Sequence, residues 1–232
     1  MNVSIDAMIE SIISACHYLP KTIELVIIPL LVGIVLGIFV ALIRVYKIPV
    51  LSQFFSFFIP IYQGIPIVVA LLIYHSLYLM KCNDVLNFFH SSKTVADIDS
   101  MIVGLFALSF MMICNISEVV RGAFLSIDKG QTEAAYAVGL SKVQTIIRII
   151  IPQVIPVAIP TMVNSTVGLI KATSIVYAVG IAEILSGALI PASRRYTFFE
   201  GYLAASLLYW ALTVAVEAAY HFAEKKSGKF RR

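Results

Sequence analysis

Charge is scarce in this sequence. Of its 232 residues, 17 are Lys or Arg and 13 are Asp or Glu, so that 13% are charged while 60% are hydrophobic. Soluble globular domains carry charge on roughly a quarter of their residues. The shortage therefore excludes a water-soluble domain and predicts an integral membrane protein. The net charge of +4 is then better explained by charge sidedness across a membrane than by nucleic-acid binding.

Cysteine and histidine are scarce too, and catalytic motifs are missing. The three Cys are widely spaced and form no ligand pair with the four His, which excludes a disulfide framework and a zinc site. The sequence contains no GxxxxGK[ST] phosphate loop, no GxSxG elbow and no HExxH helix. We therefore expect no metal, no cofactor and no catalytic residue in this chain, and any ATP chemistry must come from a different chain.

The long gaps between charged residues predict the membrane spans. One crossing needs about 20 predominantly apolar residues. Five stretches meet this requirement, namely residues 22–43, about 60–79, 101–117, 149–170 and about 198–222. We also expect an interfacial stretch near residues 51–58 and polar loops over residues 81–100 and 121–148.

A further apolar stretch, from Ala172 to Pro191, is divided by Glu183. We expect a re-entrant or half-helix element there, shielded by neighbouring helices. The predicted fold is an all-α integral membrane protein with about five transmembrane helices plus this half-helix element. All of it is expected to form a single transmembrane domain over residues 1–232.

Basic residues are unevenly divided between the two sides of this topology. With five crossings, eleven Lys and Arg lie on one side and five on the other, while Lys171 lies within the membrane. The positive-inside rule makes the eleven-charge side cytoplasmic. The amino terminus is then outside and the carboxyl terminus is cytoplasmic. A sixth full crossing at residues 172–191 would move the basic tail outside, which is why a half-helix is preferred there.

The predicted cytoplasmic loop at about 121–148 contains a short helix. The segment from Lys129 to Lys142 reads KGQTEAAYAVGLSK. A start at Gln131–Glu133 suits the helix dipole, and Gly139 is the expected left-handed stop. Because so short a helix is marginal in water, it must pack against something. Its alanine face lets another surface come close, although a plain connector between two spans is equally open from these residues alone.

This segment resembles the EAA motif of ABC-importer permease subunits. Glu133, Ala134, Ala135 and Gly139 fall on that pattern, and Pro152 supplies the proline of the helix that follows. Three more stretches resemble the polar amino acid uptake permeases, namely IYQGIPIVVALLIYH (61–75), ISEVVRGAFLSIDKGQTEAA (116–135) and IKATSIVYAVGIAEIL (170–185). The similarity extends from about residue 22 to residue 222.

The resemblance implies the permease subunit of an importer in a bacterial inner or plasma membrane, surrounded by lipid. Its partners would be a cytoplasmic ABC ATPase, which uses ATP and Mg, an external solute-binding protein, and a second permease copy or paralogue. The coupling helix of such a subunit docks on the ATPase and corresponds here to Glu133, Ala134, Ala135, Gly139 and Leu140. The subunit would move polar amino acids inward by alternating access, and cystine-like, basic and amide amino acids all remain open.

Polar groups in or beside the spans are candidates for the solute pathway, because charge inside a membrane is costly and usually faces a cavity or a partner. These candidates are Tyr62, Gln63, Glu118, Lys171, Thr173, Ser174 and Glu183. Structural alternatives accompany most of them. Glu118 can pair locally with Arg121, Lys171 can pair with Glu183, and Glu183 can instead serve a helix end. Tyr62 and Gln63 mark a helix break beside Gly64 and Pro66.

Some positions depart from the family pattern. Gln63 and Ile65 replace its usual Arg and Thr, and Ala172 replaces its usual Asp, so the substrates of other members do not transfer to this chain. A rival hypothesis is an ion-gradient-driven secondary amino acid carrier with Glu118, Lys171 and Glu183 as relay residues. It predicts uptake without an ATPase. A membrane enzyme would need a catalytic cluster that the sequence does not contain.

Overall fold

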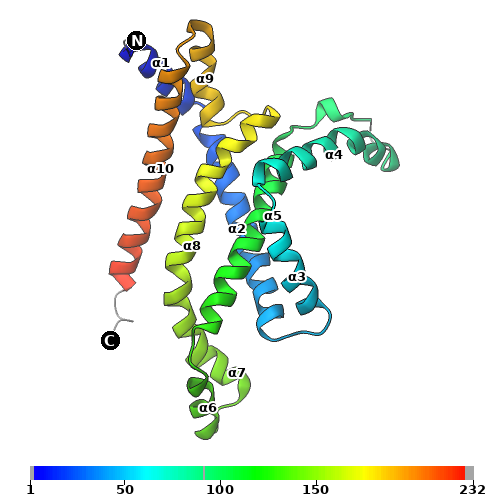
Figure 1. Cartoon of the computed structure of the whole chain (residues 1–232), viewed down its shortest axis with the longest axis vertical. Coiled ribbons are helices and arrows are strands. Elements are labelled where there is room, and N and C mark those ends of the chain that lie inside the picture. The colour runs from blue at the N-terminus through cyan, green and yellow to red at the C-terminus, as the bar shows by residue number, and fades with distance from the viewer. Residues whose placement is uncertain (1–2, 91, 228–232) are drawn as a thin grey trace. The chain divides into compact units, whose positions relative to one another are not determined.

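The computed structural model describes residues 3–90 and 92–227, except for the side chains of residues 223–227. All regular structure in this part of the chain is helical (Figure 1), which confirms the predicted all-α class. The α-helices are α1 Ile5–Cys16, α2 Leu19–Val45, α3 Leu51–Gln63, α4 Ile67–Phe88, α5 Met101–Leu125, α6 Lys129–Ala137, α7 Lys142–Thr145, α8 Ile151–Thr173, α9 Ile184–Arg195 and α10 Phe198–Ser227. Three short turns of other helix types join them, namely η1 Val95–Asp97, η2 Ile146–Ile150 and η3 Ser174–Val179.

Four helical stretches in the described residues are long and apolar enough to cross a membrane. They are Leu19–Val45, Met101–Leu125, Lys142–Val179 and Phe198–Phe222. The pair α3 and α4 brings the number to five if it is counted as one broken span. The predicted number of about five crossings is therefore confirmed.

The second predicted span is wrong in its bounds. A straight helix over residues 60–79 would run through residues 64–66, where the structure instead ends α3 and begins α4. Pro66 causes this break, because its ring disfavours helical backbone at Ile65 and it has no N–H to donate. The break that the sequence placed beside Gly64 and Pro66 is confirmed.

The polar loop expected over residues 81–100 is also partly wrong, because α4 continues to Phe88. Lys81 and Asp84 lie one helical turn apart and form an ion pair of 3.2 Å, which is compatible with helix. Beyond α4, the backbone N–H and hydroxyl of Thr94 both donate to Asp97. These two hydrogen bonds hold the pKa of Asp97 below its usual value.

The half-helix expected at residues 172–191 is present as η3 followed by α9. Gly180 lies between them with a φ of 77°, a left-handed conformation that ends the preceding helix without a side-chain clash. The twelve residues of α9 reach only about 18 Å at 1.5 Å per residue. This length is too short for a hydrocarbon core of about 30 Å.

The chain divides into two compact units. One consists of Met1–Pro29, Ile65–Ser109 and Val167–Arg232, and the other of Leu30–Gly64 and Phe110–Thr166. Both are assembled from segments that are distant in the sequence, so the units are not successive domains along the chain. A single domain over residues 1–232 stays a prediction.

In the first unit, α1, α9 and α10 pack together (Figure 1). Their shared core consists of small and aliphatic side chains, namely Ala15, Ile184, Ala188, Ala204 and Ala205. Gly187 allows α9 to approach α1 closely, because a Cβ there would lie 2.8 Å from the Cα of Ala15. Helix α1 has its own N-cap, since the hydroxyl of Ser4 accepts a hydrogen bond from the N–H of Ala7.

In the second unit, glycine allows close contact between α2 and α5. A Cβ at Gly33 would lie 2.6 Å from the Cβ of Met112, and one at Gly37 would lie 2.8 Å from the Cβ of Ile116. Two small residues four positions apart are a common device for packing membrane helices backbone to backbone. Gly33 and Gly37 therefore form a helix-packing face.

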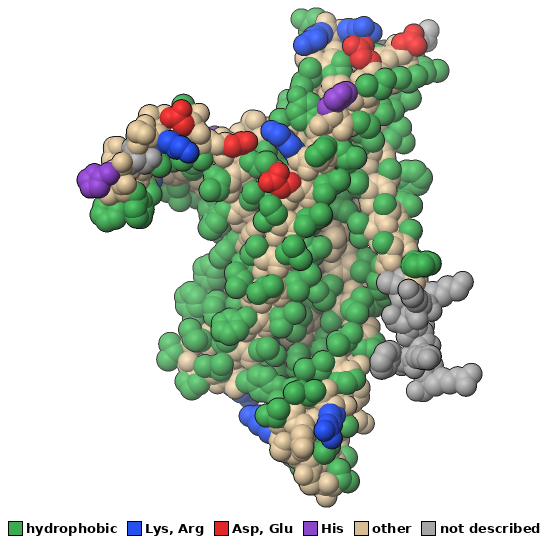
Figure 2. Space-filling view, turned by 180° about the vertical axis from the view of Figure 1, so that it is seen from behind, with side chains coloured by type: hydrophobic (Ala, Val, Ile, Leu, Met, Phe, Trp, Pro, Cys, Tyr) green, Lys and Arg blue, Asp and Glu red, His purple; other side chains and the backbone are tan. Residues whose placement is uncertain are grey.

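The outer face of α2 is apolar and exposed. Leu31, Val35 and Phe39 lie four residues apart along one stripe and are 57%, 67% and 63% exposed. Figure 2 shows that hydrophobic side chains cover most of the long helices on the face in view. Exposure of large apolar side chains along a spanning helix fits contact with lipid, where burial from water needs no protein neighbour.

Candidate functional site

The candidate coupling helix is α6, and its N-terminus is capped by Asp128. The Asp128 carboxylate accepts a hydrogen bond of 2.6 Å from the N–H of Gly130, which satisfies one of the free donors of the first turn. The helix begins at Lys129, so the predicted start at Gln131–Glu133 is wrong by about half a turn. The acidic residue at the start of α6 is therefore the N-cap Asp128, one position before the helix, and Glu133 lies in its second turn.

The C-terminus of α6 ends in a left-handed glycine, as predicted. Gly139 has a φ of 83°. Its N–H donates to the carbonyl of Tyr136 at 3.0 Å, and the N–H of Leu140 donates to the carbonyl of Ala135 at 3.0 Å. This pair of bonds is the Schellman arrangement that closes helix ends. The helix is therefore fixed at both ends by local hydrogen bonds, despite its nine residues.

Side chains of α6 divide between a covered and an open face. Ala135 is buried at 5% exposure, whereas Glu133, Ala134 and Ala137 are exposed. Val138, just past the helix, is 77% exposed. The open face is thus small and partly apolar, so another surface can come close to the α6 backbone.

The other end of the loop connects α6 to α8. Ser141 and Gln144 form a reciprocal capping box at the start of α7, and the π-helical turn η2 leads directly into α8. The side-chain amide of Gln153 on α8 donates to the side chain of Gln131 on α6 at 3.3 Å. Ala123, Ile150, Val154 and Ala158 form the buried cluster that packs α5 against η2 and α8.

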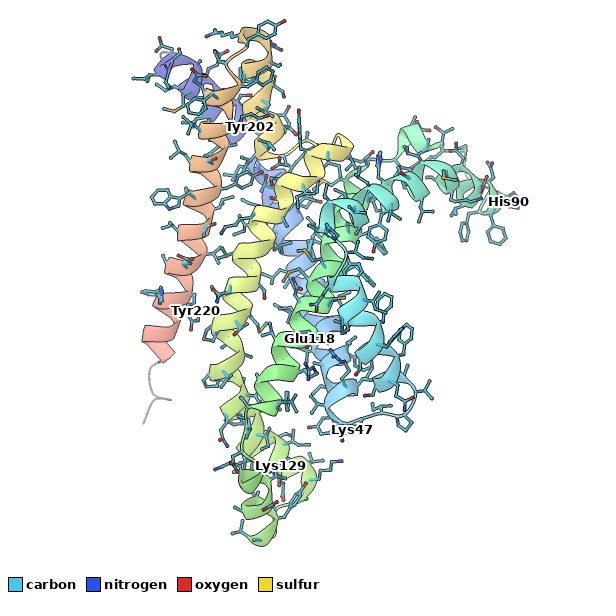
Figure 3. All side chains as sticks on the ribbon, viewed as in Figure 1. Lys47, His90, Glu118, Lys129, Tyr202 and Tyr220 are labelled. Carbon is cyan, nitrogen blue, oxygen red and sulfur yellow. The ribbon has the colours of Figure 1, made fainter. Side chains whose placement is uncertain are left out.

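Glu118 on α5 (Figure 3) is the centre of a cluster of charges with Arg44, at the end of α2, and Arg121. Arg44 donates from Nη1 to Oε1 of Glu118 at 2.6 Å. Arg121 donates from Nε and Nη2 to Oε2 of Glu118 at 3.1 and 2.7 Å. Only 5% of the Arg44 side chain is exposed, against 26% of Glu118.

Two hydroxyls complete the contacts of Arg44. It donates to the hydroxyl of Ser117 from Nη1 and to that of Ser56 from Nε, each at 3.4 Å. Three helices of one unit, α2, α3 and α5, therefore meet at a single guanidinium. The local pair between Glu118 and Arg121 that the sequence offered as an alternative is confirmed, but Arg44 was missed. Because Arg44 and Glu118 are 74 positions apart, sequence spacing carries no signal for their contact.

Tyr62 and Gln63 lie at the C-terminal end of α3, next to the break. The side-chain amide of Gln63 donates to Asn115 on α5 at 3.2 Å. The ring of Tyr62 is buried and lies nearly perpendicular to the ring of Phe110, with 4.7 Å between the ring centroids. Both candidate pathway residues therefore join α3 to α5.

Glu183 belongs to a buried hydrogen-bond cluster in the other unit. It is fully buried and caps α9, because its Oε1 accepts from the N–H of Leu185 at 2.8 Å. Its Oε2 accepts a hydrogen bond from the hydroxyl of Tyr209 on α10. The hydroxyl of Thr22 on α2 accepts from the N–H of Ile184 at 3.1 Å. Glu183 thus uses both oxygens within the protein.

The remaining candidates lie where α8 ends. Lys171 is exposed and forms no ion pair in the part of the chain that the structure describes, so the alternative of a pair with Glu183 is not found there. Thr173 is buried and donates to the carbonyl of Ile170 at 2.7 Å. Ser174 donates to the carbonyl of Lys171 at 2.8 Å. Of these three side chains, Lys171 is the most accessible to a solute.

The described part of the chain has the features of an integral membrane protein, with four or five apolar stretches long enough to span a membrane and a capped, exposed helix between two of them. The chain belongs to the family described as binding-protein-dependent transport system inner membrane components, which matches residues 33–229. Within that family it is an ABC-importer permease of the polar amino acid type, because its curated relatives are named as amino-acid permeases.

Relatives match the chain over nearly its whole length. The probable amino-acid ABC transporter permease protein PatM of Vibrio harveyi is 32% identical over 230 residues, covering 99% of this chain and 98% of the relative. The probable amino-acid permease protein YxeN of Bacillus subtilis is 34% identical, covering 96% of this chain and 95% of the relative. The L-cystine transport system permease protein TcyL of Bacillus subtilis is 34% identical, covering 91% and 86%.

Solved structures agree in fold. The crystal structure of an amino acid ABC transporter with histidines matches with a TM-score of 0.79 and 25% identity, covering 97% of this chain and all of that chain. The inward-facing MetNI methionine ABC transporter matches with a TM-score of 0.62 and 16% identity, covering 87% and 92%. The second match supports the fold alone. The chain is therefore an amino-acid permease of an ABC importer.

Proposed function

We propose that this chain moves polar amino acids into the cytoplasm by alternating access, driven by a separate ABC ATPase that docks on α6. An external protein would deliver the solute, and a second permease copy or a paralogue would complete the pathway. ATP and Mg would be bound by the ATPase. The amino terminus would lie outside and the carboxyl terminus in the cytoplasm, as the distribution of basic residues favours.

The observation that carries this proposal is the form of α6. It is capped at both ends and leaves Glu133, Ala134 and Ala137 exposed. A docking helix must transmit force as a rigid body, so its own ends have to be fixed. Small exposed side chains then let the ATPase contact the helix close to its backbone. The motif resemblance at Glu133–Gly139 supports the same segment as the docking site.

The connections of α6 supply a route for transmitting its movement. The hydrogen bond between Gln131 and Gln153 joins α6 to α8, and η2 continues into α8 without a loop. A displacement of α6 would therefore move the start of a spanning helix. The proposal needs two arrangements of α8, one open to each side of the membrane.

Among the pathway candidates, Lys171 is the best placed to contact solute, because it is exposed and without an ion pair in the described residues. Its ammonium suits the carboxylate of a zwitterionic amino acid, and Ser174 lies in the next turn. Tyr62, Gln63 and Glu118 remain candidates in the other unit, although their contacts to α5, Arg44 and Arg121 also serve structure. Thr173 and Glu183 would act mainly by holding their helices.

Solute identity stays open within polar amino acids. One relative is named for L-cystine, and a solved structure is titled for an amino acid transporter with histidines. The departures at Gln63, Ile65 and Ala172 argue against copying either preference. Binding assays on the external partner would identify the solute directly.

Transport by purified components tests the proposal. Proteoliposomes containing this chain, its second permease subunit and the ATPase would receive radiolabelled amino acids with the solute-binding protein outside and ATP inside. Uptake is expected only when ATP, the ATPase and the binding protein are all present, and it should survive an ionophore. Uptake by this chain without an ATPase, abolished by the ionophore, would instead establish the secondary carrier.

A further inference from the structure

A cavity lies behind α6, on the side away from its exposed alanines. Its volume is about 250 Å³, roughly eight times the volume of a water molecule in the liquid. Lys129, Thr132 and Tyr136 line it from α6. Their spacing of three and four residues places them on one helical face. Tyr46, after α2, and Lys142, at the start of α7, close it from other elements.

The polar lining of this cavity is cationic. Lys129 and Lys142 are its charged residues, and no Asp or Glu lines it. Neither lysine forms an ion pair in the described part of the chain. The carboxylates closest in sequence are Asp128, which caps α6, and Glu133, which is exposed. The Nζ of Lys142 lies 5.5 Å from the centre of the Tyr46 ring, a cation–π contact that leaves its positive charge uncompensated.

The hydroxyls around the cavity are hydrogen-bond donors. Burial and the neighbouring Tyr136 raise the pKa of Tyr46, so its phenol stays protonated at neutral pH. Thr132 and Tyr136 add two more hydroxyls. Thr145 also lines the cavity, but its hydroxyl already donates to the carbonyl of Ser141. The two ammonium groups and the other three hydroxyls suit an anion with several oxygen acceptors, above all a phosphate group.

The cavity lies where the spans end. Val45 is the last residue of one candidate span, Leu125 is the last of another, and Lys142 is the first of a third, and all three line the cavity. Apolar wall residues, Ile127, Ile146 and Ile150, complete it. Lipid phosphates sit at the depth where hydrocarbon-spanning helices end. Basic pockets between spanning helices bind anionic lipid headgroups.

We propose that this cavity binds the phosphate headgroup of an anionic membrane lipid, held by Lys129 and Lys142. The lipid would then support α6 from its membrane side while the opposite face stays free for another protein. The proposal of this lipid site assumes only that the chain lies in a membrane. It stands whether or not the ATPase docks on α6.

Native mass spectrometry of the purified transporter complex tests this site by direct lipid binding. The complex would be delipidated in detergent and titrated with phosphatidylglycerol or with zwitterionic phosphatidylcholine. Wild type is expected to retain phosphatidylglycerol preferentially. The K129Q/K142Q variant should bind it about thirtyfold more weakly, the effect that two lysines exert near an anionic surface. Wild-type affinity in this variant would overturn the proposal.

Matched variants separate the site from general surface charge. K129R/K142R keeps both charges and should retain the lipid, whereas K47Q removes an exposed lysine that does not line the cavity and should leave binding unchanged. An equal loss in K47Q would overturn the site. Should K129Q/K142Q fail to assemble, K142Q alone should weaken binding about fivefold.

A competition experiment tests whether the cavity binds a lipid headgroup or a free anion. Inorganic phosphate at millimolar concentration should not displace phosphatidylglycerol, because the acyl chains hold the headgroup at the span ends. Full displacement of phosphatidylglycerol by phosphate, together with equal binding of phosphate to complexes that contain only phosphatidylcholine, would assign the cavity to a soluble phosphate. That result would overturn the lipid proposal.

Discussion

Nη1 of Arg44 and Oε1 of Glu118 lie 2.6 Å apart, although 74 positions separate the two residues in the sequence. The contact joins the end of α2 to α5. Because Arg121 binds the other carboxylate oxygen, one carboxylate is shared by two guanidinium groups. Removing Glu118 would leave two like charges side by side.

The first prediction concerns this shared carboxylate. R44Q should destabilise the protein by about 2 to 4 kcal/mol, because it breaks a pair in which the arginine is buried. R121Q should cost about 1 kcal/mol or less, since that side chain is 34% exposed. Thermal unfolding in detergent, read by the loss of monodisperse protein, would give the order. A larger loss for R121Q than for R44Q would contradict this account.

The second prediction concerns the end of α6. G139A places a side chain at a φ of 83°, which costs about 1 to 2 kcal/mol. Amide hydrogen exchange should quicken most over residues 134–140, where the strained turn lies. G122A is the matched control, because a Cβ at Gly122 meets nothing within 4 Å. Unchanged exchange in G139A would show that the left-handed turn does not hold α6.

A third prediction addresses the contact between α2 and α5. G33A should destabilise by about 1 to 3 kcal/mol, because its Cβ would lie 2.6 Å from that of Met112 and the helices must separate. G168A should be neutral or slightly stabilising, since its site in α8 is open and alanine favours helix. The thermal unfolding midpoints of the two variants measure this difference in stability. Equal midpoints would mean that α2 and α5 are not closely packed at this glycine.

The fourth prediction separates structure from transport at Glu183. E183A should lower stability by about 2 to 4 kcal/mol, because it removes the N-cap of α9 and the acceptor of the Tyr209 hydroxyl. E183Q keeps an oxygen acceptor and should be milder. If Glu183 contacts solute instead, E183Q would raise the KM for uptake with an unchanged unfolding midpoint. Measuring both quantities on one preparation distinguishes the two roles.

Much of the fold could be predicted from gaps between charges. Spanning helices contain few charges, so the positions of α2, α5 and α10 follow from composition. Their ends do not: α5, predicted to end at residue 117, continues through Glu118 and Arg121 to Leu125. The continuation of α4 through Lys81 and Asp84 was missed because charges were equated with a loop, whereas a pair one turn apart is compatible with helix. Helix α1 was not predicted, because its twelve residues are too few to span a membrane and the prediction followed long apolar stretches.

The candidate site was predictable where local chemistry decides it. Gly139 ends α6 because glycine readily adopts the left-handed backbone conformation, a preference that can be read from a short stretch of sequence. The start was misplaced because Asp128 and Glu133 both suit a first turn, and only geometry selects between them. Arg44 and Tyr209 could not be predicted, because their partners are distant in sequence and depend on how helices pack. The close contact of Gly33 and Gly37 with α5 depends on helix packing in the same way.

The central claim is that α6 is the contact for an ABC ATPase. Its most direct test is copurification of the ATPase with the A134R/A137R variant, which places two large cations on the exposed face and leaves the caps intact. We predict that wild type retains the ATPase stoichiometrically, and that A134R/A137R loses it with an unchanged unfolding midpoint. Full retention by a folded A134R/A137R variant would contradict the account.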